Sequence, residues 1–201
     1  MNTHESSRRR ARLGLIGLAA LFFVPLALSF YLYYGTGWRP EGGAQHGELI
    51  DPARPLPAAS LQQADGTTTG EDFLRGKWHL VYVGDGGCAA ACRDALVKSR
   101  QVRLALDKDI GRVGRVFLYE GPAPDPDLVA GGHPDLVAAS LSGESAAGLR
   151  AAFSPGPEPA AADCLYIVDP LGNLMMRYPP DATPRAILTD LERLLRLSHI
   201  G

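Results

Sequence analysis

Residues 76–92 read GKWHLVYVGDGGCAAAC, and this stretch decides the fold. The run 78–83 is almost entirely apolar, β-branched or aromatic, which is typical of a central strand buried on both faces. Glycines then break the run. Beyond them, apolar residues recur with helical spacing as far as Leu106, and charged residues fill the opposite side. The pattern predicts a buried strand, a glycine turn and an amphipathic helix over about 89–107, with two cysteines at the junction.

The segments that follow predict a sheet. Apolar strands are expected at 115–119 and 165–168, and a turn at 169–173 leads into a hairpin partner at 174–178. A strand, a helix and a second strand in this order imply a right-handed parallel crossover. The sequence therefore predicts an α/β fold.

Shorter elements complete the expected fold. Asp65-Gly66 signals a small hairpin within 61–69. Short helices are predicted at about 134–141 and 145–153. A final helix follows Thr183, which can cap it, and its first turn holds a proline. One apolar face of that helix comprises Ile187, Leu188, Leu191, Leu194 and Leu195.

Composition limits the classes of function. The chain has 201 residues, of which 46% are hydrophobic and 21% charged, so a packed core is expected and wholesale disorder is not. The net charge of −2 gives no case for nucleic-acid binding. The charge is uneven, because residues 1–12 hold four arginines against one glutamate.

Residues 13–34 predict a transmembrane helix. These 22 residues carry no charge, and about 20 suffice to cross a bilayer. A signal-peptide core is usually only about 7–15 residues long. No small-x-small cleavage site follows Ser29, and the chain continues with aromatic residues typical of a membrane interface. We therefore expect an uncleaved anchor rather than a removed signal.

The arginines predict the orientation of this anchor. Positive charge stays on the cytoplasmic side, so residues 1–12 are expected to form a basic tip in the cytoplasm. The expected location is the bacterial inner membrane, crossed once, with the C-terminal domain in the periplasm. Residues 35–60, rich in glycine and proline, are interpreted as a linker to a domain at 61–201.

Cys88 and Cys92 are the candidate functional pair. A thiol at a helix N-terminus meets the positive end of the helix dipole, which favours its thiolate, and Cys88 is the better placed of the two. The four-residue offset puts both sulfurs on one side of the helix, where they can form a disulfide or bind a soft ion such as Cu(I). The alternative is that two small buried cysteines simply pack under the helix.

Three other residues are weaker candidates. Cys164 opens an expected strand and is either a third soft ligand, a resolving thiol or a buried small side chain. His133 could be a metal ligand on a loop, but an exposed loop histidine is the favoured interpretation. His79 alternates within a buried strand and is expected to be a core histidine with its hydrogen bonds satisfied.

The strand at 76–83, the motif at 87–92 and the later LYIVDPLG at 165–172 resemble the Sco/SenC family. Its members are membrane-anchored thioredoxin-like proteins that serve cytochrome c oxidase assembly. The likeness covers about residues 48–197. It implies a thioredoxin-like fold with a central mixed sheet flanked by helices. It also implies Cu(I) as a cofactor, and oxidase subunits or other assembly factors as partners.

Two departures make the chain a divergent relative. The family usually has proline after the second cysteine, where this chain has Arg93. In the family, a copper-ligating histidine lies five residues before the strand tyrosine. The corresponding residue here is Ala161, and Cys164 lies nearby. The resemblance therefore implies weaker Cu(I) binding than in histidine-bearing relatives.

Three functions compete. The first is an oxidase assembly factor that acts by thiol-disulfide exchange or copper transfer. The second is a general periplasmic thiol oxidoreductase, an enzyme whose usual signature is C-x-x-C with a facing cis-proline. This chain has three intervening residues and no proline just before 165. The third is a binding module that keeps the fold without catalysis, which the missing histidine favours.

Overall fold

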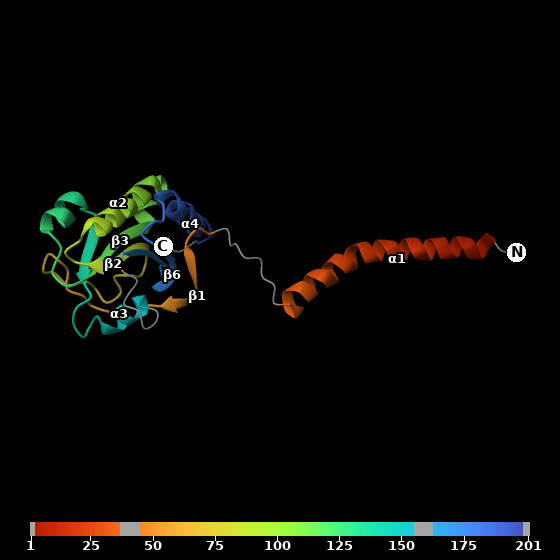
Figure 1. Cartoon of the computed structure of the whole chain (residues 1–201), viewed down its shortest axis with the longest axis horizontal. Helices are drawn as coiled ribbons and strands as arrows, with labels where there is room; N and C mark the ends of the chain where they lie inside the picture. The colour runs from red at the N-terminus through yellow and green to blue at the C-terminus, as the bar shows by residue number, and fades with distance from the viewer. Residues whose placement is uncertain (1–2, 37–44, 155–162, 199–201) are drawn as a thin grey trace. The chain divides into compact units, whose positions relative to one another are not determined.

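The computed structural model describes residues 3–36, 45–154 and 163–198. The chain divides into two compact units, Met1–Gly43 and Ala44–Gly201, which we describe separately (Figure 1).

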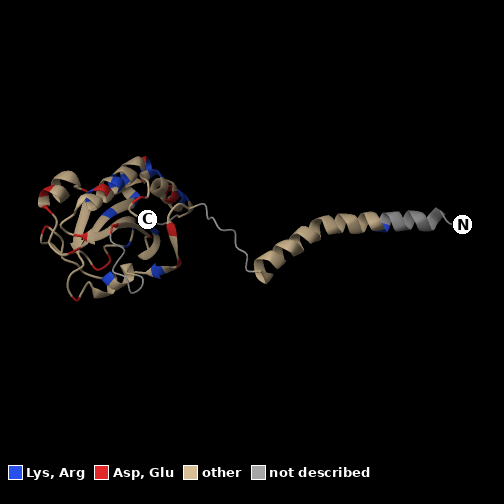
Figure 2. Cartoon of the chain, viewed as in Figure 1, with Lys and Arg blue, Asp and Glu red and all other residues tan. Residues whose placement is uncertain are grey.

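The described part of the first unit, residues 3–36, is one long helix. Helix α1 (Thr3–Phe30) continues into a π-helical turn, η1 (Tyr31–Gly35). Its stretch Arg12–Gly35 is 24 residues long and apolar enough to cross a membrane. Figure 2 shows that the described part of this stretch carries no charge beyond Arg12. The predicted span at 13–34 lies within it, and it is the one candidate transmembrane helix among the residues that the structure describes.

The second unit is built on a mixed six-stranded sheet with the order β1-β6-β5-β2-β3-β4. Strands β2, β3 and β4 are parallel to one another, whereas β5 is antiparallel to β2, β6 to β5 and β1 to β6. The strands are β1 (Glu48–Pro55), β2 (Trp78–Asp85), β3 (Val113–Glu120), β4 (Leu136–Ser140), β5 (Cys164–Val168) and β6 (Asn173–Tyr178).

Helices cover both faces of this sheet (Figure 1). Helices α2 (Ala90–Ala105) and α4 (Pro184–Leu197) pack on one face, and α3 (Ala147–Phe153) packs on the other. Two short helical turns, η2 (Asp107–Arg112) and η3 (Asp127–Gly132), flank β3 in the sequence. The fold is thioredoxin-like, and the predicted strands, first crossover helix and last helix are confirmed.

The sheet separates two hydrophobic cores, and strand β2 contributes side chains to both. Leu80 and Tyr82 point into the core beneath α2 and α4, and Val81 and Val83 point into the core beside α3. All four side chains are buried, as the apolar run predicts. Because side chains alternate along a strand, neighbours in sequence belong to opposite cores.

Two sequence predictions need correction. The helix expected at 134–141 is strand β4, whose residues pair with β3 and contribute to both cores, so pairing overrides the helical propensity of its alanines. The linker expected at 35–60 contains β1, which forms an edge of the sheet by pairing with β6. The small hairpin expected within 61–69 is confirmed, because Gln62 and Thr68 form an antiparallel bridge and the Thr69 N–H donates to the Leu61 carbonyl at 2.9 Å.

Candidate functional site

The turn between β2 and α2 holds Cys88 in an uncommon conformation. The Asp85 carboxylate accepts a hydrogen bond from the Gly87 N–H at 2.8 Å, and the Asp85 carbonyl accepts one from the Cys88 N–H at 3.1 Å. Cys88 has a φ of 45°, in the left-handed region that side chains other than glycine rarely adopt. Such strain costs about 1–3 kcal/mol and clusters at functional sites.

Gly86 brings the end of β3 against this turn. Its N–H donates to the Glu120 carbonyl at 2.8 Å, and a Cβ at this position would lie 1.7 Å from the Pro122 carbonyl oxygen. Only glycine fits here. Gly86 therefore does more than end the strand, because it lets the turn pack against the segment that follows β3.

Cys88 and Cys92 form a disulfide, with their Cα atoms 5.0 Å apart. This separation is within the ordinary range for a disulfide. Both residues are buried, with exposed fractions of 1% and 3%, in the core that also holds Tyr82 and Phe117. The predicted pairing of the two cysteines is thus present, although Cys88 lies before α2 and only Cys92 lies within it.

The first turn of α2 begins close to the pair and carries no carboxylate of its own. Ala89, the N-cap, makes no capping hydrogen bond through its side chain, and the first turn holds no acidic residue. The first N–H groups of a helix lack partners within the helix and carry its positive dipole end. The Arg93 side chain adds a cation there, with its Nε donating to the Cys88 carbonyl at 3.1 Å.

The structure does not bring Cys164 to the pair. Cys164 opens β5 opposite Val83, and its side chain lies in the core beside α3, whereas Cys88 and Cys92 lie in the core beneath α2. The sheet separates the two sites. Burial raises the pKa of the Cys164 thiol, which favours its neutral form. Of its three interpretations, the geometry supports a buried small side chain.

The two candidate histidines differ from expectation. His133 is buried rather than exposed, because it packs against the side chain of Arg115. His79 is buried as expected, but its Nδ1 has no hydrogen-bond partner among the described residues, so its hydrogen bonding is not satisfied. Burial lowers its pKa to about 4.

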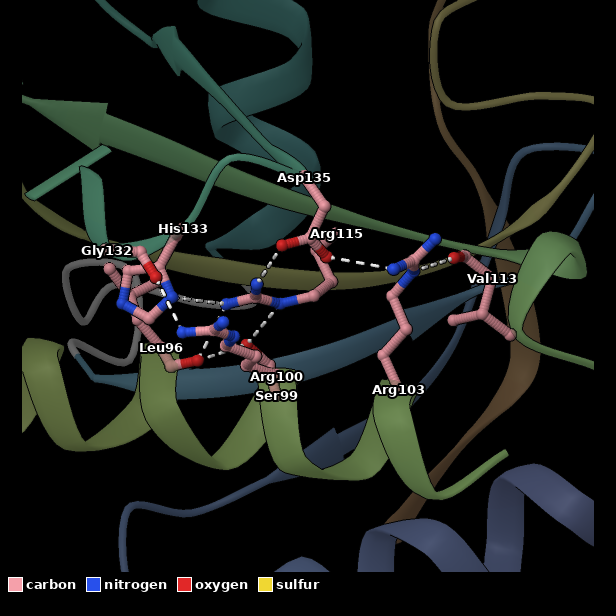
Figure 3. Close-up of polar contacts among 9 residues, drawn as sticks. All are labelled: Leu96, Ser99, Arg100, Arg103, Val113, Arg115, Gly132, His133 and Asp135. Carbon is pink, nitrogen blue, oxygen red and sulfur yellow. Dashed lines mark hydrogen bonds and ion pairs between the residues drawn. The ribbon is translucent and has the colours of Figure 1, made fainter. Parts of the chain in front are cut away.

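A buried arginine network fixes α2 on the sheet (Figure 3). Arg115 points from β3 toward α2 and is fully buried. Its guanidinium donates to the Asp135 carboxylate at 2.9 Å, to the Ser99 hydroxyl at 3.0 Å and to the Leu96 carbonyl at 2.7 Å. Because Ser99 and Leu96 belong to the helix that carries Cys92, this network positions the second cysteine.

Two further residues complete the network. Arg103 donates to the other Asp135 oxygen at 3.2 Å, so one carboxylate serves two arginines. His133 Nδ1 lies 3.3 Å from the Arg115 guanidinium and must accept, since a guanidinium only donates. Burial, with Arg115 and Arg100, lowers the pKa of His133 and keeps it neutral. The sequence analysis missed this network, although an arginine inside an apolar strand was its signal.

A second polar pair lies at the end of the sheet where β2 leads into the cysteine turn. The Tyr82 hydroxyl donates to the carboxylate of Asp163, which has a φ of 68° and directly precedes β5. Burial, and then this hydrogen bond, raise the pKa of Tyr82. Within residues 3–36, 45–154 and 163–198, no group of three or more His, Cys, Asp or Glu side chains is arranged to hold a metal ion. Ala161 lies outside the described residues.

Comparison with known families shows which family the second unit matches. Residues 78–198 match the family described as "Transmembrane-like, thioredoxin-like, C-terminal domain". The chain belongs to this family. The match extends from the first residue of β2 to just beyond the end of α4, and so includes the Cys88–Cys92 pair. A search of the curated proteins gives no match to the sequence.

Solved structures show that this transmembrane-like, thioredoxin-like domain shares its fold with Sco proteins. Apo Sco1 from Thermus thermophilus superposes with a TM-score of 0.60 at 21% identity, covering 75% of this chain and 96% of that one. Copper-bound ScoI from Arabidopsis thaliana gives 0.57 at 22% identity, covering 70% and 98%. BsSco, a Sco-family cytochrome c oxidase assembly protein with a disulfide switch, gives 0.55 at 15% identity, covering 75% and 99%.

Proposed function

We propose that this chain assists cytochrome c oxidase assembly as a membrane-anchored thioredoxin-fold protein, with Cys88 and Cys92 as its reversible dithiol–disulfide couple. The observation that carries the proposal is the disulfide itself, which lies between a buried strand and a helix N-terminus. The shared fold supports the link to the oxidase, because BsSco combines this fold with a disulfide switch and oxidase assembly.

Thiol-disulfide exchange requires only the two sulfurs of the pair. A thiolate of a partner dithiol attacks one sulfur of the Cys88–Cys92 bond, that bond breaks, and a mixed disulfide forms. The second partner thiolate then attacks the partner sulfur of the mixed disulfide and releases the reduced pair. Two electrons pass to Cys88 and Cys92, and the partner dithiol becomes a disulfide. The thiols of the partner lose two protons, and the reduced pair can take up two.

The proposed location suits this chemistry. We place the second unit in the periplasm and the basic tip at 1–12 in the cytoplasm, with α1 across the bacterial inner membrane. The distribution of arginines supports this orientation. Disulfides form and persist in the periplasm, whereas the cytoplasm keeps thiols reduced.

Cu(I) is the proposed alternative cargo of the reduced pair. Two thiolates one helical turn apart are soft ligands that suit Cu(I), so the donor set fits the ion. The described residues bring no third ligand to the pair, and Cys164 faces the opposite core. We therefore expect weaker Cu(I) binding than in histidine-bearing relatives, and we favour exchange over copper transfer.

Copper competition separates these two modes. We expect the reduced full-length protein to lose Cu(I) to a chelator more readily than an Ala161→His variant does. A Cys164→Ser variant should match the wild-type protein, because its side chain lies across the sheet from the pair. If Cys164→Ser abolishes binding and Ala161→His does not tighten it, the site uses three cysteines and the two-ligand account is wrong.

A cellular test addresses the assembly role. Cells that carry Cys88→Ser together with Cys92→Ser should lose oxidase activity in their membranes, and Cys164→Ser cells should retain it. Normal oxidase activity in the double variant would contradict the assembly role. A general loss of periplasmic disulfides would instead favour a general thiol oxidoreductase.

The low exposure of the pair favours one further candidate. Cys88 is only 1% exposed and Cys92 3%, so exchange requires the turn to open before a thiolate can attack either sulfur. A binding module that keeps the disulfide as a structural link would look the same. A double variant that retains oxidase activity but unfolds more easily would identify that role.

A further inference from the structure

The Cys88–Cys92 disulfide is closed to solvent, and its two cysteines belong to different kinds of structure. Cys92 lies within α2, which the network around Arg115 holds on the sheet. Cys88 lies before this helix, in the turn of residues 85–89. Because both cysteines are buried, one part has to move before a sulfur can be attacked. Movement of the turn is the change that leaves the helix and its network in place.

Two exposed residues hold this turn closed through their side chains. The Asp85 carboxylate, at the end of β2, accepts a hydrogen bond from the Gly87 N–H at 2.8 Å. The Arg93 side chain, in the first turn of α2, donates from Nε to the Cys88 carbonyl at 3.1 Å. No ion pair joins Asp85 to Arg93 among the described residues, so each holds the turn by its own hydrogen bond.

The backbone of the turn is held by few contacts and carries a strained residue. The Cys88 N–H donates to the Asp85 carbonyl at 3.1 Å, and the Gly86 N–H donates to the Glu120 carbonyl at 2.8 Å. Against these bonds, Cys88 has a φ of 45°, and its strain disfavours the closed turn. Segments held by few hydrogen bonds open locally at a lower cost than the whole domain unfolds.

We propose that the turn of residues 85–89 is a gate over the buried disulfide, held closed by the side chains of Asp85 and Arg93. Exchange proceeds when this turn opens while the rest of the domain stays folded. Asp85 and Arg93 are positioning residues, because they act on the turn and not on the partner. The proposal rests on the exchange function proposed above and names what limits its rate. Opening breaks hydrogen bonds only, and the disulfide stays bonded until a reductant attacks it.

An uncharged phosphine, tris(hydroxypropyl)phosphine, is the probe, because neither the carboxylate nor the guanidinium attracts or repels it. Its phosphorus attacks one sulfur, the S–S bond breaks, and the other sulfur leaves as a thiolate. Water then attacks the phosphorus and releases the first sulfur, which gives the phosphine oxide. The phosphorus loses two electrons and the cysteines gain them. With the two protons of the water molecule, the cysteines become two thiols.

The rate of this reduction, measured on the full-length protein in detergent, reports the opening. Quenched samples are followed by mass tagging of the new thiols. We expect Asp85→Ala and Arg93→Met each to raise the initial slope of rate against phosphine concentration about tenfold, because each removes one hydrogen bond to a charged group. Asp85→Asn keeps an oxygen that accepts from the Gly87 N–H, and it should raise the slope by no more than about threefold.

Two matched controls remove the same kinds of contact elsewhere. The Asp65 carboxylate accepts from the Thr67 N–H, two residues on, at 2.9 Å. Arg100 is exposed on α2 and donates to the Gly132 carbonyl at 2.8 Å. Neither contact involves the cysteine turn. Asp65→Ala and Arg100→Met should therefore leave the slope unchanged.

The kinetics of urea unfolding separate a gate from a general loss of stability. A gate requires the wild-type disulfide, at high phosphine concentration, to be reduced faster than the domain unfolds when unfolding rates are extrapolated to zero urea. This comparison uses the unchanged protein, so it holds even if a variant fails to fold. In Asp85→Ala and Arg93→Met the slope should rise more than the globally unfolded fraction does, whereas a purely structural role would raise both equally.

The outcomes separate the gate from the function beneath it. The gate is wrong, while the redox couple stands, if Asp85→Ala and Arg93→Met match the two controls. It is also wrong if wild-type reduction is no faster than global unfolding. If reduction passes through the gate but the pair does not re-form its disulfide when glutathione disulfide is added, the exchange function fails and the gate covers a structural link.

Discussion

At the scale of single residues, His79 is the clearest case of a group whose protonation is opposed by folding. Its ring packs on Gly114, where an added Cβ would lie 2.8 Å from a ring carbon. Its Nδ1 has no partner among the described residues, and burial lowers its pKa to about 4 from an ordinary 6.5. The folded chain therefore holds this histidine neutral under conditions in which the unfolded chain would protonate it.

This predicts a loss of stability in mild acid. Below about pH 6.5 the unfolded state binds a proton at His79 that the folded state refuses until about pH 4. The free energy of unfolding should fall by about 3 kcal/mol across that window because of this residue alone. In His79→Leu the fall should be correspondingly smaller, with only the part due to His133 and other groups remaining. Urea unfolding followed by tryptophan fluorescence measures both. Parallel pH curves for the two proteins would show that His79 is not the cause.

The direction in which a side chain points explains which contacts could be predicted from the sequence and which could not. The relation between Cys88 and Cys92 is local, so their helical offset was enough to predict that they meet. The relation between Cys164 and the pair depends on which face of β5 carries it, and that is set by pairing with Val83. No spacing within the sequence contains that information. The burial of His133 was missed because it depends on contact with Arg115, eighteen residues away in the sequence.

At the scale of elements, the orientation of α2 depends on a polar network rather than on apolar packing alone. Arg115 is fully buried, and Asp135 is its only carboxylate partner among the described residues. Breaking a buried ion pair is costly because it leaves one charge without compensation. Asp135 also precedes β4 directly, so the network joins the helix to the edge strand that the sequence analysis assigned to a helix.

Asp135→Asn should therefore destabilise the domain. The substitution keeps the volume but leaves the buried Arg115 charge unpaired, and we expect a loss of about 3 kcal/mol in the free energy of unfolding. Asp109→Asn is the matched control, because Asp109 pairs with a partly exposed arginine, Arg112, at 3.3 Å and should cost less than about 1 kcal/mol. Equal losses in urea unfolding would mean that the network is no more important than a surface pair.

At the scale of the whole molecule, the strongest sequence signals were long and regular. The apolar run at 13–34 and the amphipathic face of α4 each extend over several turns, and both became helices. Strands β1 and β4 were missed because one lies among prolines and the other among alanines, and each is stabilised by a neighbouring strand distant in sequence. Long-range pairing of this kind leaves little trace in local composition.

The proposed topology is open to direct test. The test uses a reporter enzyme that is active only outside the cytoplasm. When it is fused after Gly201 we expect activity, because the arginines at 8–12 stay inside. Moving those arginines to follow the apolar helix is the matched control and should invert the result. An inactive fusion, or a shortened soluble form of the protein, would contradict the anchored topology.

The central claim is that Cys88 and Cys92 form a reversible disulfide, and thiol trapping with a mass tag tests it most directly. Full-length protein is quenched in acid on isolation, and its free thiols are tagged before and after mild reduction. We predict one tag before reduction, on Cys164 once the chain is unfolded, and three after it, with a return to one when the oxidant is restored. Three tags on the freshly isolated, unreduced protein would contradict the account.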